Sequence, residues 1–227
     1  MWSFLLKSKD EAFETFKKFK AGIKKLIGCL IKCFRTDRGG EFNSHEFKTF
    51  CENTGISRQL TAPYTLQQNG VVERRNRTLM EMTRSIMKAM GVPNYLWGEA
   101  ARYATYLINR VPTRALVDQT PYECFKEEKP NLEHLKVFGC LAYAKIEDTN
   151  LKKLDDRTRP LVHLGTEPDS KAYRFFNPKT RKIIISRDVV FNETARWNWE
   201  KNEDSEPGKF TAYFGNFLDV GAGPIMV

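Results

Sequence analysis

Residues that build metal or disulfide frameworks are scarce in this sequence. Its 227 residues include five cysteines and three histidines. An odd number of scattered cysteines argues against a disulfide framework. Cys29 and Cys33 lie close together, but no second cysteine or histidine pair follows at zinc-binding spacing. We therefore expect reduced, mostly buried thiols in an intracellular protein.

Long hydrophobic runs are also missing. No apolar run approaches the roughly 18 residues that a membrane-spanning helix requires, so no membrane partner is expected. The opening MWSFLLKSKD has no basic segment followed by a long apolar one, so no secretory signal is expected either. A composition of 41% hydrophobic and 29% charged residues, without internal repeats, is typical of a globular protein.

Positive charge is what the chain has in excess. Its formal net charge is +9 and its pI about 9.3. A basic surplus favours polyanionic partners such as nucleic acid. Charge alone does not choose between such a partner and simple solubility.

The clearest helix is predicted between Val71 and Met90, because Gly91 and Pro93 follow it. At about 100° per residue, its apolar positions form one stripe: Val72, Leu79, Met82, Ile86 and Met90. The opposite stripe is charged and mostly cationic: Glu73, Arg77, Glu81, Arg84 and Lys88. This pattern predicts a helix that packs on one side and presents cations on the other.

Two carboxylates stand at positions suited to binding a divalent metal. Asp37 ends the predicted strand LIKCFRTD and precedes two glycines, and Glu73 lies in the first turn of the long helix. Hard carboxylate oxygens suit Mg²⁺ or Mn²⁺, and two such ions can clamp the reacting oxygens of a phosphoryl transfer. Taken singly, Asp37 is better explained as a turn residue and Glu73 as compensation of the helix dipole, and only their joint arrangement favours a metal site.

After about Leu135 the pattern changes to short strands. The segments KVFGCLAYA, PLVHLG, AYRFF and KIIISRDVVF are predicted strands, and NPKT at Asn177 is a predicted hairpin turn. Their close spacing suggests a small β-barrel. Nearer the start, residues 2–6 are a predicted strand, and Ser8 with Glu11 a predicted capping box.

Together these stretches resemble the integrases of copia-type long-terminal-repeat retrotransposons, within the retroviral integrase superfamily. The resemblance rests on RTDRGGEF, GISRQLTAPYTLQQNGVVERRNRTLMEMTRSIM, LWGEAARYATYLINRVPT, TPYECF, HLKVFGCLAYA and SRDVVF. It implies an α/β fold: an RNase H-like integrase core lacking its first strand, followed by a small β-barrel (Src-homology-3-like) domain. The expected boundaries are 1–128 for the core, 135–194 for the β domain and 195–227 for an irregular tail.

The resemblance also implies a chemistry. Asp37 corresponds to the family's second aspartate and Glu73 to its glutamate, both as ligands of Mg²⁺ or Mn²⁺. The metal would support nicking of the element's DNA end and then attack of the 3′-hydroxyl on target DNA. Asn69 and Gly70 would lie in a loop beside the active site. The cations Arg77, Arg84 and Lys88 would contact phosphate.

The family further implies multimeric action on DNA, in the nucleus. Its first aspartate belongs to a strand upstream of Trp2 in this numbering, so the chain alone is expected not to perform strand transfer. Two functions stay open: a polynucleotidyl transferase (integrase) fragment, and a catalytically dead DNA-binding remnant of a Pol polyprotein. A third interpretation is a non-functional translated relic that folds poorly.

Overall fold

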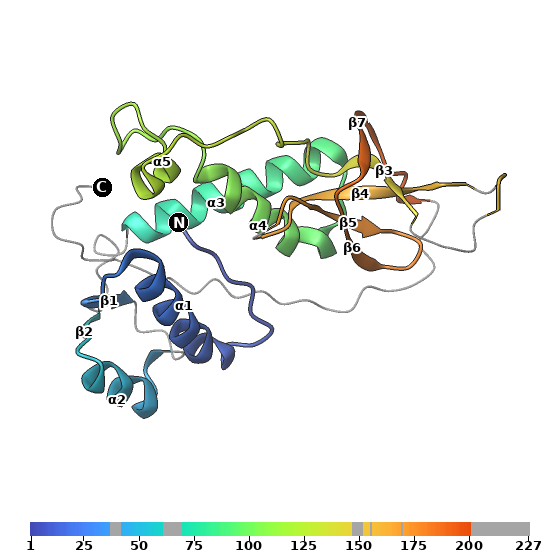
Figure 1. The fold of residues 1–227 in the computed structure, drawn as a ribbon. Helices are drawn as coiled ribbons and strands as arrows, with labels where there is room; N and C mark the ends of the chain where they lie inside the picture. Colours follow the sequence, from blue (N-terminus) through green and yellow to red (C-terminus); the bar gives the residue numbers. More distant parts are fainter. Residues whose placement is uncertain (37–41, 61–69, 147–151, 155, 169, 201–227) are drawn as a thin grey trace. The chain divides into compact units, whose positions relative to one another are not determined.

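The computed structural model describes residues 1–36, 42–60, 70–146, 152–154, 156–168 and 170–200 (Figure 1). Contacts divide the chain into two units. The first comprises Met1–Thr78 and Arg114–Val117, and the second Leu79–Thr113 and the described part of Asp118–Lys209. The long helix α3 (Gly70–Met90) runs across the boundary between them.

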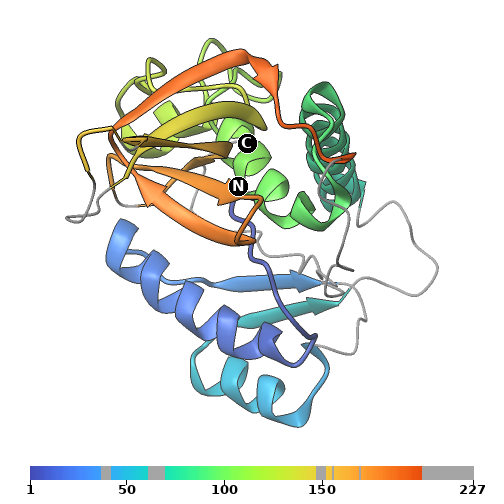
Figure 2. The same ribbon diagram turned by 90° about the vertical axis from the view of Figure 1, so that its right-hand side faces the viewer.

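The first unit combines two helices with a pair of parallel strands. Its elements are α1 (Glu11–Ile27), β1 (Cys33–Thr36), α2 (His45–Asn53) and β2 (Ser57–Leu60). Figure 2 shows β1 and β2 side by side, and their register runs from Cys33 opposite Ser57 to Thr36 opposite Leu60. The strand predicted at LIKCFRTD is therefore confirmed over Cys33–Thr36.

Phenylalanine rings fill the core of the first unit. Phe34 of β1 lies 4.9 Å from Phe16 of α1 and 5.3 Å from Phe47 of α2, measured between ring centroids. Phe42 is 1% exposed and lies 5.1 Å from Phe34. Each tilted or edge-on ring pair adds about 0.5–1.5 kcal/mol beyond simple burial, so the phenylalanine spacing of the two helices places them against β1.

Two local predictions near the start of the chain are wrong. Residues 2–6 form no strand. Helix α1 begins after Asp10 rather than after Ser8, and Asp10 makes no side-chain cap hydrogen bond. The Glu11 side chain instead accepts a hydrogen bond from the backbone N–H of Lys7, at 2.9 Å. The carboxylate therefore satisfies the backbone donor one residue before the one that the predicted capping box requires.

The second unit begins with helices. After α3 come a 3-10 turn, η3 (Asn94–Leu96), then α4 (Trp97–Ile108) and α5 (Pro121–Lys126). A capping box opens α5, because the Thr120 side chain accepts from the Glu123 N–H while the Glu123 carboxylate accepts from the Thr120 N–H. Of the described residues, none belongs to a helix long and apolar enough to cross a membrane.

Five antiparallel strands follow. They are β3 (Cys140–Lys145), β4 (Thr158–Thr166), β5 (Tyr173–Asn177), β6 (Lys182–Ser186) and β7 (Val189–Arg196), in the sheet order β6-β5-β4-β3-β7. The predicted strand KIIISRDVVF is thus two strands, β6 and β7, which lie at opposite edges of the sheet. The hairpin at Asn177 is confirmed, with the Arg181 N–H donating to the Asn177 carbonyl at 2.7 Å.

Helices and sheet of the second unit share one core. Buried residues from α3, α4 and the strands pack together, including Met87, Tyr103, Val162 and Phe176. The approach of α4 to β4 is close enough that a Cβ on Gly165, where φ is +111°, would collide with the Tyr103 ring. A side chain at this position would therefore push the helix off the sheet.

The end of the described chain belongs to this core as well. Strand β7 continues to Arg196, past the boundary at residue 194 that the sequence suggested. Trp197 and Trp199 then pack against the same core, with the Trp199 ring 6.2 Å from Phe176. Residues 201–227 of the predicted tail lie outside the described residues.

Candidate nucleic-acid interface

Helix α3 presents a charged face that matches the sequence prediction. At about 100° per residue, the five residues of this face lie within roughly 80° of one another around the helix axis. All five side chains are exposed: Glu73, Arg77, Glu81, Arg84 and Lys88. We call this set the α3 charged face. Its three cations lie on one side of the helix and are open to a polyanion.

The other side of α3 is buried, slightly rotated from the predicted stripe. Leu79 and Met90 are buried as predicted, whereas Val72, Met82 and Ile86 are only half-buried. Thr83 and Met87 are buried in addition. Thr83 is tolerated inside because its hydroxyl donates to the Leu79 carbonyl at 2.7 Å, as threonine commonly does within helices.

Two cations on α3 were missed by the sequence reasoning. Arg74 and Arg75 directly follow Glu73 and are both exposed. By its helical angle Arg75 lies on the apolar side of α3, so the helical periodicity predicted a buried residue there rather than an exposed cation. The run ERRNR was the available signal, because three arginines in one turn form a local cationic cluster whatever their angle.

The predicted catalytic residues are only partly within the described chain. Glu73 is an exposed carboxylate in the first turn of α3, and Gly70 is the first residue of that helix. Asp37 and Asn69 lie outside the described residues, so the structure gives no distance between Asp37 and Glu73.

A divalent metal needs several hard ligands in one place. In the described part of the chain, no group of three or more histidines, cysteines, aspartates or glutamates could hold a metal ion. The described residues alone therefore do not complete the predicted Mg²⁺ or Mn²⁺ site, and Glu73 stays a predicted ligand. The cysteines give no alternative site, and no disulfide joins the five of them, all of which the structure describes.

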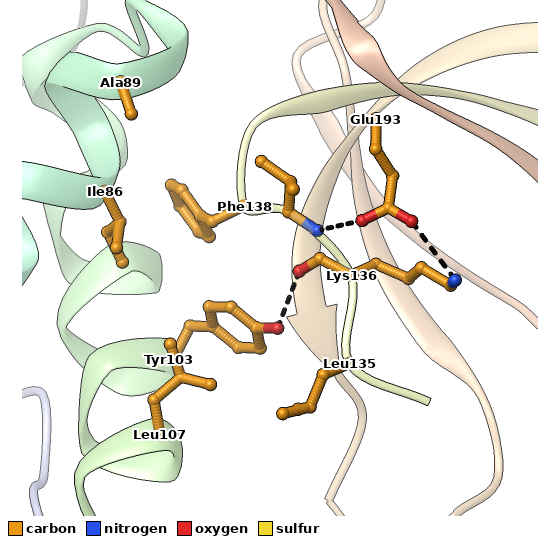
Figure 3. Close-up of a pocket in the computed structure, with 9 residues that line it drawn as sticks. Ile86, Ala89, Tyr103, Leu107, Leu135, Lys136, Phe138 and Glu193 are labelled. Atoms are coloured by element: carbon orange, nitrogen blue, oxygen red, sulfur yellow. Dashed lines mark hydrogen bonds and ion pairs between the residues drawn. The ribbon is translucent and has the colours of Figure 1, made fainter. Parts of the chain in front are cut away.

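A small apolar cavity of about 350 Å³ lies in the second unit, between α3, α4, the segment before β3 and β7 (Figure 3). Its polar groups are engaged with one another. The Glu193 carboxylate accepts from the Val137 N–H at 2.9 Å and from the Lys136 ammonium at 3.2 Å. The Tyr103 hydroxyl donates to the Lys136 carbonyl at 2.8 Å.

These contacts explain the electrostatics of the cavity. The hydrogen bond from Val137 is the largest effect on Glu193, and with Lys136 it lowers the pKa of that carboxyl. Burial raises the pKa of Tyr103 to about 12. Neither group is therefore poised to exchange a proton near neutral pH.

Curated relatives of this chain are transposon polyproteins. The chain is 41% identical over 194 residues to the retrovirus-related Pol polyprotein from transposon TNT 1-94 of Nicotiana tabacum, covering 86% of this chain and 15% of the relative. It is 34% identical over 192 residues to the Pol polyprotein from transposon RE1 of Arabidopsis thaliana, covering 85% of this chain and 13% of the relative. The chain is a homologue of copia-type retrotransposon Pol polyproteins.

Two protein families match parts of this Pol homologue. Residues 140–206 match the retroviral polymerase SH3-like domain, and residues 7–89 match the TnsB C-terminal domain. The first match covers the described strands β3 to β7, which confirms the predicted SH3-like sheet within a mixed α/β chain. Among solved structures, the chain matches the catalytic core domain of BIV integrase with a TM-score of 0.39 and 22% identity, covering 54% of this chain and 73% of that one.

The resemblance inferred from the motifs is thus confirmed at the level of the family. The Pol homologue spans about one seventh of the length of these relatives (15% and 13%).

Proposed function

We propose that this integrase-derived chain binds DNA through the α3 charged face. The supporting observation is the exposure of Arg77, Arg84 and Lys88 along one side of a single rigid helix. Cations held on a helix keep their spacing, so three phosphates are engaged at little cost in side-chain ordering compared with a loop. Such contacts fix position on the backbone and read no sequence.

Binding of this kind is dominated by counterion release. Each neutralised phosphate contributes about −0.9 to the slope of log affinity against log salt concentration on duplex DNA. Replacing Arg77, Arg84 and Lys88 together by glutamine is expected to weaken binding about 10- to 100-fold and to reduce the slope by roughly 3. The measurement is fluorescence anisotropy of a labelled duplex across a salt series, with a chelator present so that no cleavage occurs.

A matched control separates a specific face from net charge. Lys18, Lys24 and Lys25 are exposed on α1, and their replacement by glutamine removes the same number of charges. We expect this control to bind nearly as tightly as the native chain. Equal losses in the two triple variants would mean that only the overall charge of +9 matters, and absence of binding by the native chain would contradict the proposal.

We further propose Asp37 and Glu73 as ligands of Mg²⁺ or Mn²⁺ in a DNA-processing site. The motif resemblance supports these assignments. When bound, the metal would supply activation of water for 3′-end processing and of the 3′-hydroxyl for strand transfer. Glu73 itself offers a carboxylate at a helix start, where its position is rigid.

Incubation of a labelled element-end duplex with the purified chain and Mg²⁺ tests this assignment. Cleavage that disappears in Glu73→Gln and persists in Glu81→Gln, on the same helix face, would support it. DNA binding without cleavage would assign the chain instead to the second class, a non-catalytic DNA-binding remnant. The partners proposed are therefore DNA, both element ends and target DNA, and further copies of the chain, acting in the nucleus.

A further inference from the structure

Strand β6 forms an edge of the five-stranded sheet, and no other strand of the described residues pairs with its outer side. Its sequence is Lys-Ile-Ile-Ile-Ser. Ile183 is 39% exposed and Ile185 is 53% exposed. A β-branched edge of this kind, with its one charge at the first residue, Lys182, is a template for another strand, because no described strand pairs with its outward N–H and C=O groups.

The exposed isoleucines extend a buried apolar surface. Across the β5–β6 ladder, Ile183 lies opposite Phe176, and Ile185 lies opposite Arg174. Phe176 is 4% exposed and belongs to the core that the sheet shares with the helices. One more strand beside β6 would cover the two isoleucines and so continue the apolar face by one row.

The opposite edge of the sheet has a different character. Strand β7 alternates, and most of its exposed positions are polar or charged: Asn192, Thr194 and Arg196. Val190 is the exception, at 70% exposed. Polar and charged side chains discourage pairing of an edge, so the two edges of the same sheet are not equivalent, and β6 is the one suited to a partner.

We propose that β6 pairs antiparallel with β6 of a second copy of this chain, about a two-fold axis at Ile184. This register places Ile183 opposite Ile185 of the partner subunit, so the exposed apolar side chains meet. It places Lys182 opposite Ser186 of the partner subunit, so no like charges face each other within the strand. An isologous contact of this type closes as a dimer.

The arginines that flank β6 each have a partner on their own chain. Arg181 has a φ of +55° and its guanidinium lies over the Tyr95 ring, 5.4 Å from the centroid. Arg187 lies beside Asp188, with a nitrogen–oxygen distance of 4.0 Å. Their like charges would otherwise oppose each other at the two ends of the paired strands. The inference deepens the self-association proposed above and rests on it.

The first experiment is the mass of the nuclease-treated full chain by light scattering, over a concentration series in about 0.3 M salt, where exposed charges are screened. We expect a concentration-dependent dimer. The double variant Ile183→Lys with Ile185→Lys is expected to be a monomer. The control Val190→Lys with Thr194→Lys adds the same charge to the β7 edge and is expected to dimerise like the native chain.

A second experiment tests the register and does not depend on the folding of a lysine variant. In a Cys29→Ser background, Ile184→Cys is expected to form a disulfide-linked dimer when a mild oxidant is added, because residue 184 faces its own copy. Ile183→Cys faces residue 185 instead and is expected to cross-link far less. Equal cross-linking of the two variants would contradict the register.

The outcomes distinguish this inference from the proposed function. A dimer that persists in the Ile183, Ile185 double variant would show self-association through another surface and overturn the β6 contact. A native chain that is a monomer throughout would overturn both the β6 contact and the proposed self-association. Binding of DNA is measured separately with the α3 variants. Its outcome does not depend on whether the chain dimerises or on which surface forms the dimer.

Discussion

His163 lies on β4 with its side chain fully buried among aromatic rings. Its Nδ1 atom is 3.0 Å from the Val137 carbonyl oxygen. Burial is the largest effect on this group and lowers its pKa from 6.5 to about 4, although the Val137 hydrogen bond and the charge of Glu193 act in the opposite direction. The imidazole is therefore neutral in the folded chain at physiological pH.

This burial predicts acid sensitivity of the second unit. Between pH 6.5 and 4 the unfolded chain binds a proton at His163 that the folded chain does not. The free energy of unfolding therefore falls by about 1.36 kcal/mol per pH unit, or about 3 kcal/mol over that window. Urea unfolding at pH 7.5, 5.5 and 4.5 measures it.

Variants isolate the contribution of this histidine. His163→Phe removes the titration and is expected to flatten the pH dependence, whatever its effect at pH 7.5. His45→Gln, at an exposed position at the start of α2, is expected to leave it unchanged. A pH dependence that survives in His163→Phe would assign the acid sensitivity to carboxylates instead.

At the scale of elements, a charged network ties α4 to the sheet. Glu99 of α4 contacts Arg174 of β5 at 2.8 Å and Arg102 at 3.0 Å. Arg174 also contacts Glu167 at 2.7 Å, and Arg102 donates to the Thr166 carbonyl at 2.8 Å. Burial would raise the pKa of Glu99, but the hydrogen bond from Arg174 and the charge of Arg102 lower it overall, so the carboxylate stays ionised.

Breaking this network by one partner is expected to be costly. Glu99→Gln leaves two half-buried guanidinium groups without their shared carboxylate, which should destabilise the second unit by about 1–3 kcal/mol. The same substitution at Glu14, which pairs with Lys17 on the surface of α1, should cost less than about 0.5 kcal/mol. Urea unfolding followed by circular dichroism compares the two, and similar losses would show that the network adds little.

At the scale of the whole molecule, the buried residues form separate cores. The first unit is built around Phe16 and its neighbours, and the second around the helix–sheet core that contains Phe176. Each core has its own aromatic contacts. The two units should therefore respond separately to core substitutions.

Amide hydrogen exchange tests that separation with a crossed pair of variants. Phe16→Ala should destabilise the first unit by about 3–5 kcal/mol and lower protection in α1 and β1, while leaving β3 and β4 protected. Phe176→Ala should give the reverse pattern. Loss of protection in both units with either variant would mean that the chain unfolds as one cooperative body.

The sequence by itself determined the features that depend on local periodicity and turn chemistry. Helix α3 and its charged face follow from the 3.6-residue repeat, the capping box at Thr120 from residues three apart, and the hairpin at Asn177 from a four-residue turn. Glu73 and the cations after it were placed on the exposed side for the same reason. Such features need no knowledge of distant contacts.

Only the tertiary structure decided the rest, because it depends on residues far apart in the chain. KIIISRDVVF reads as one β-rich run, and its division into β6 and β7 is set by pairing with β5 and β3 at opposite edges. The burial of His163 and the pairing of Glu99 with Arg174 arise where α4 meets the sheet. Sequence spacing does not encode such contacts, since they form only when separate elements pack on a common core.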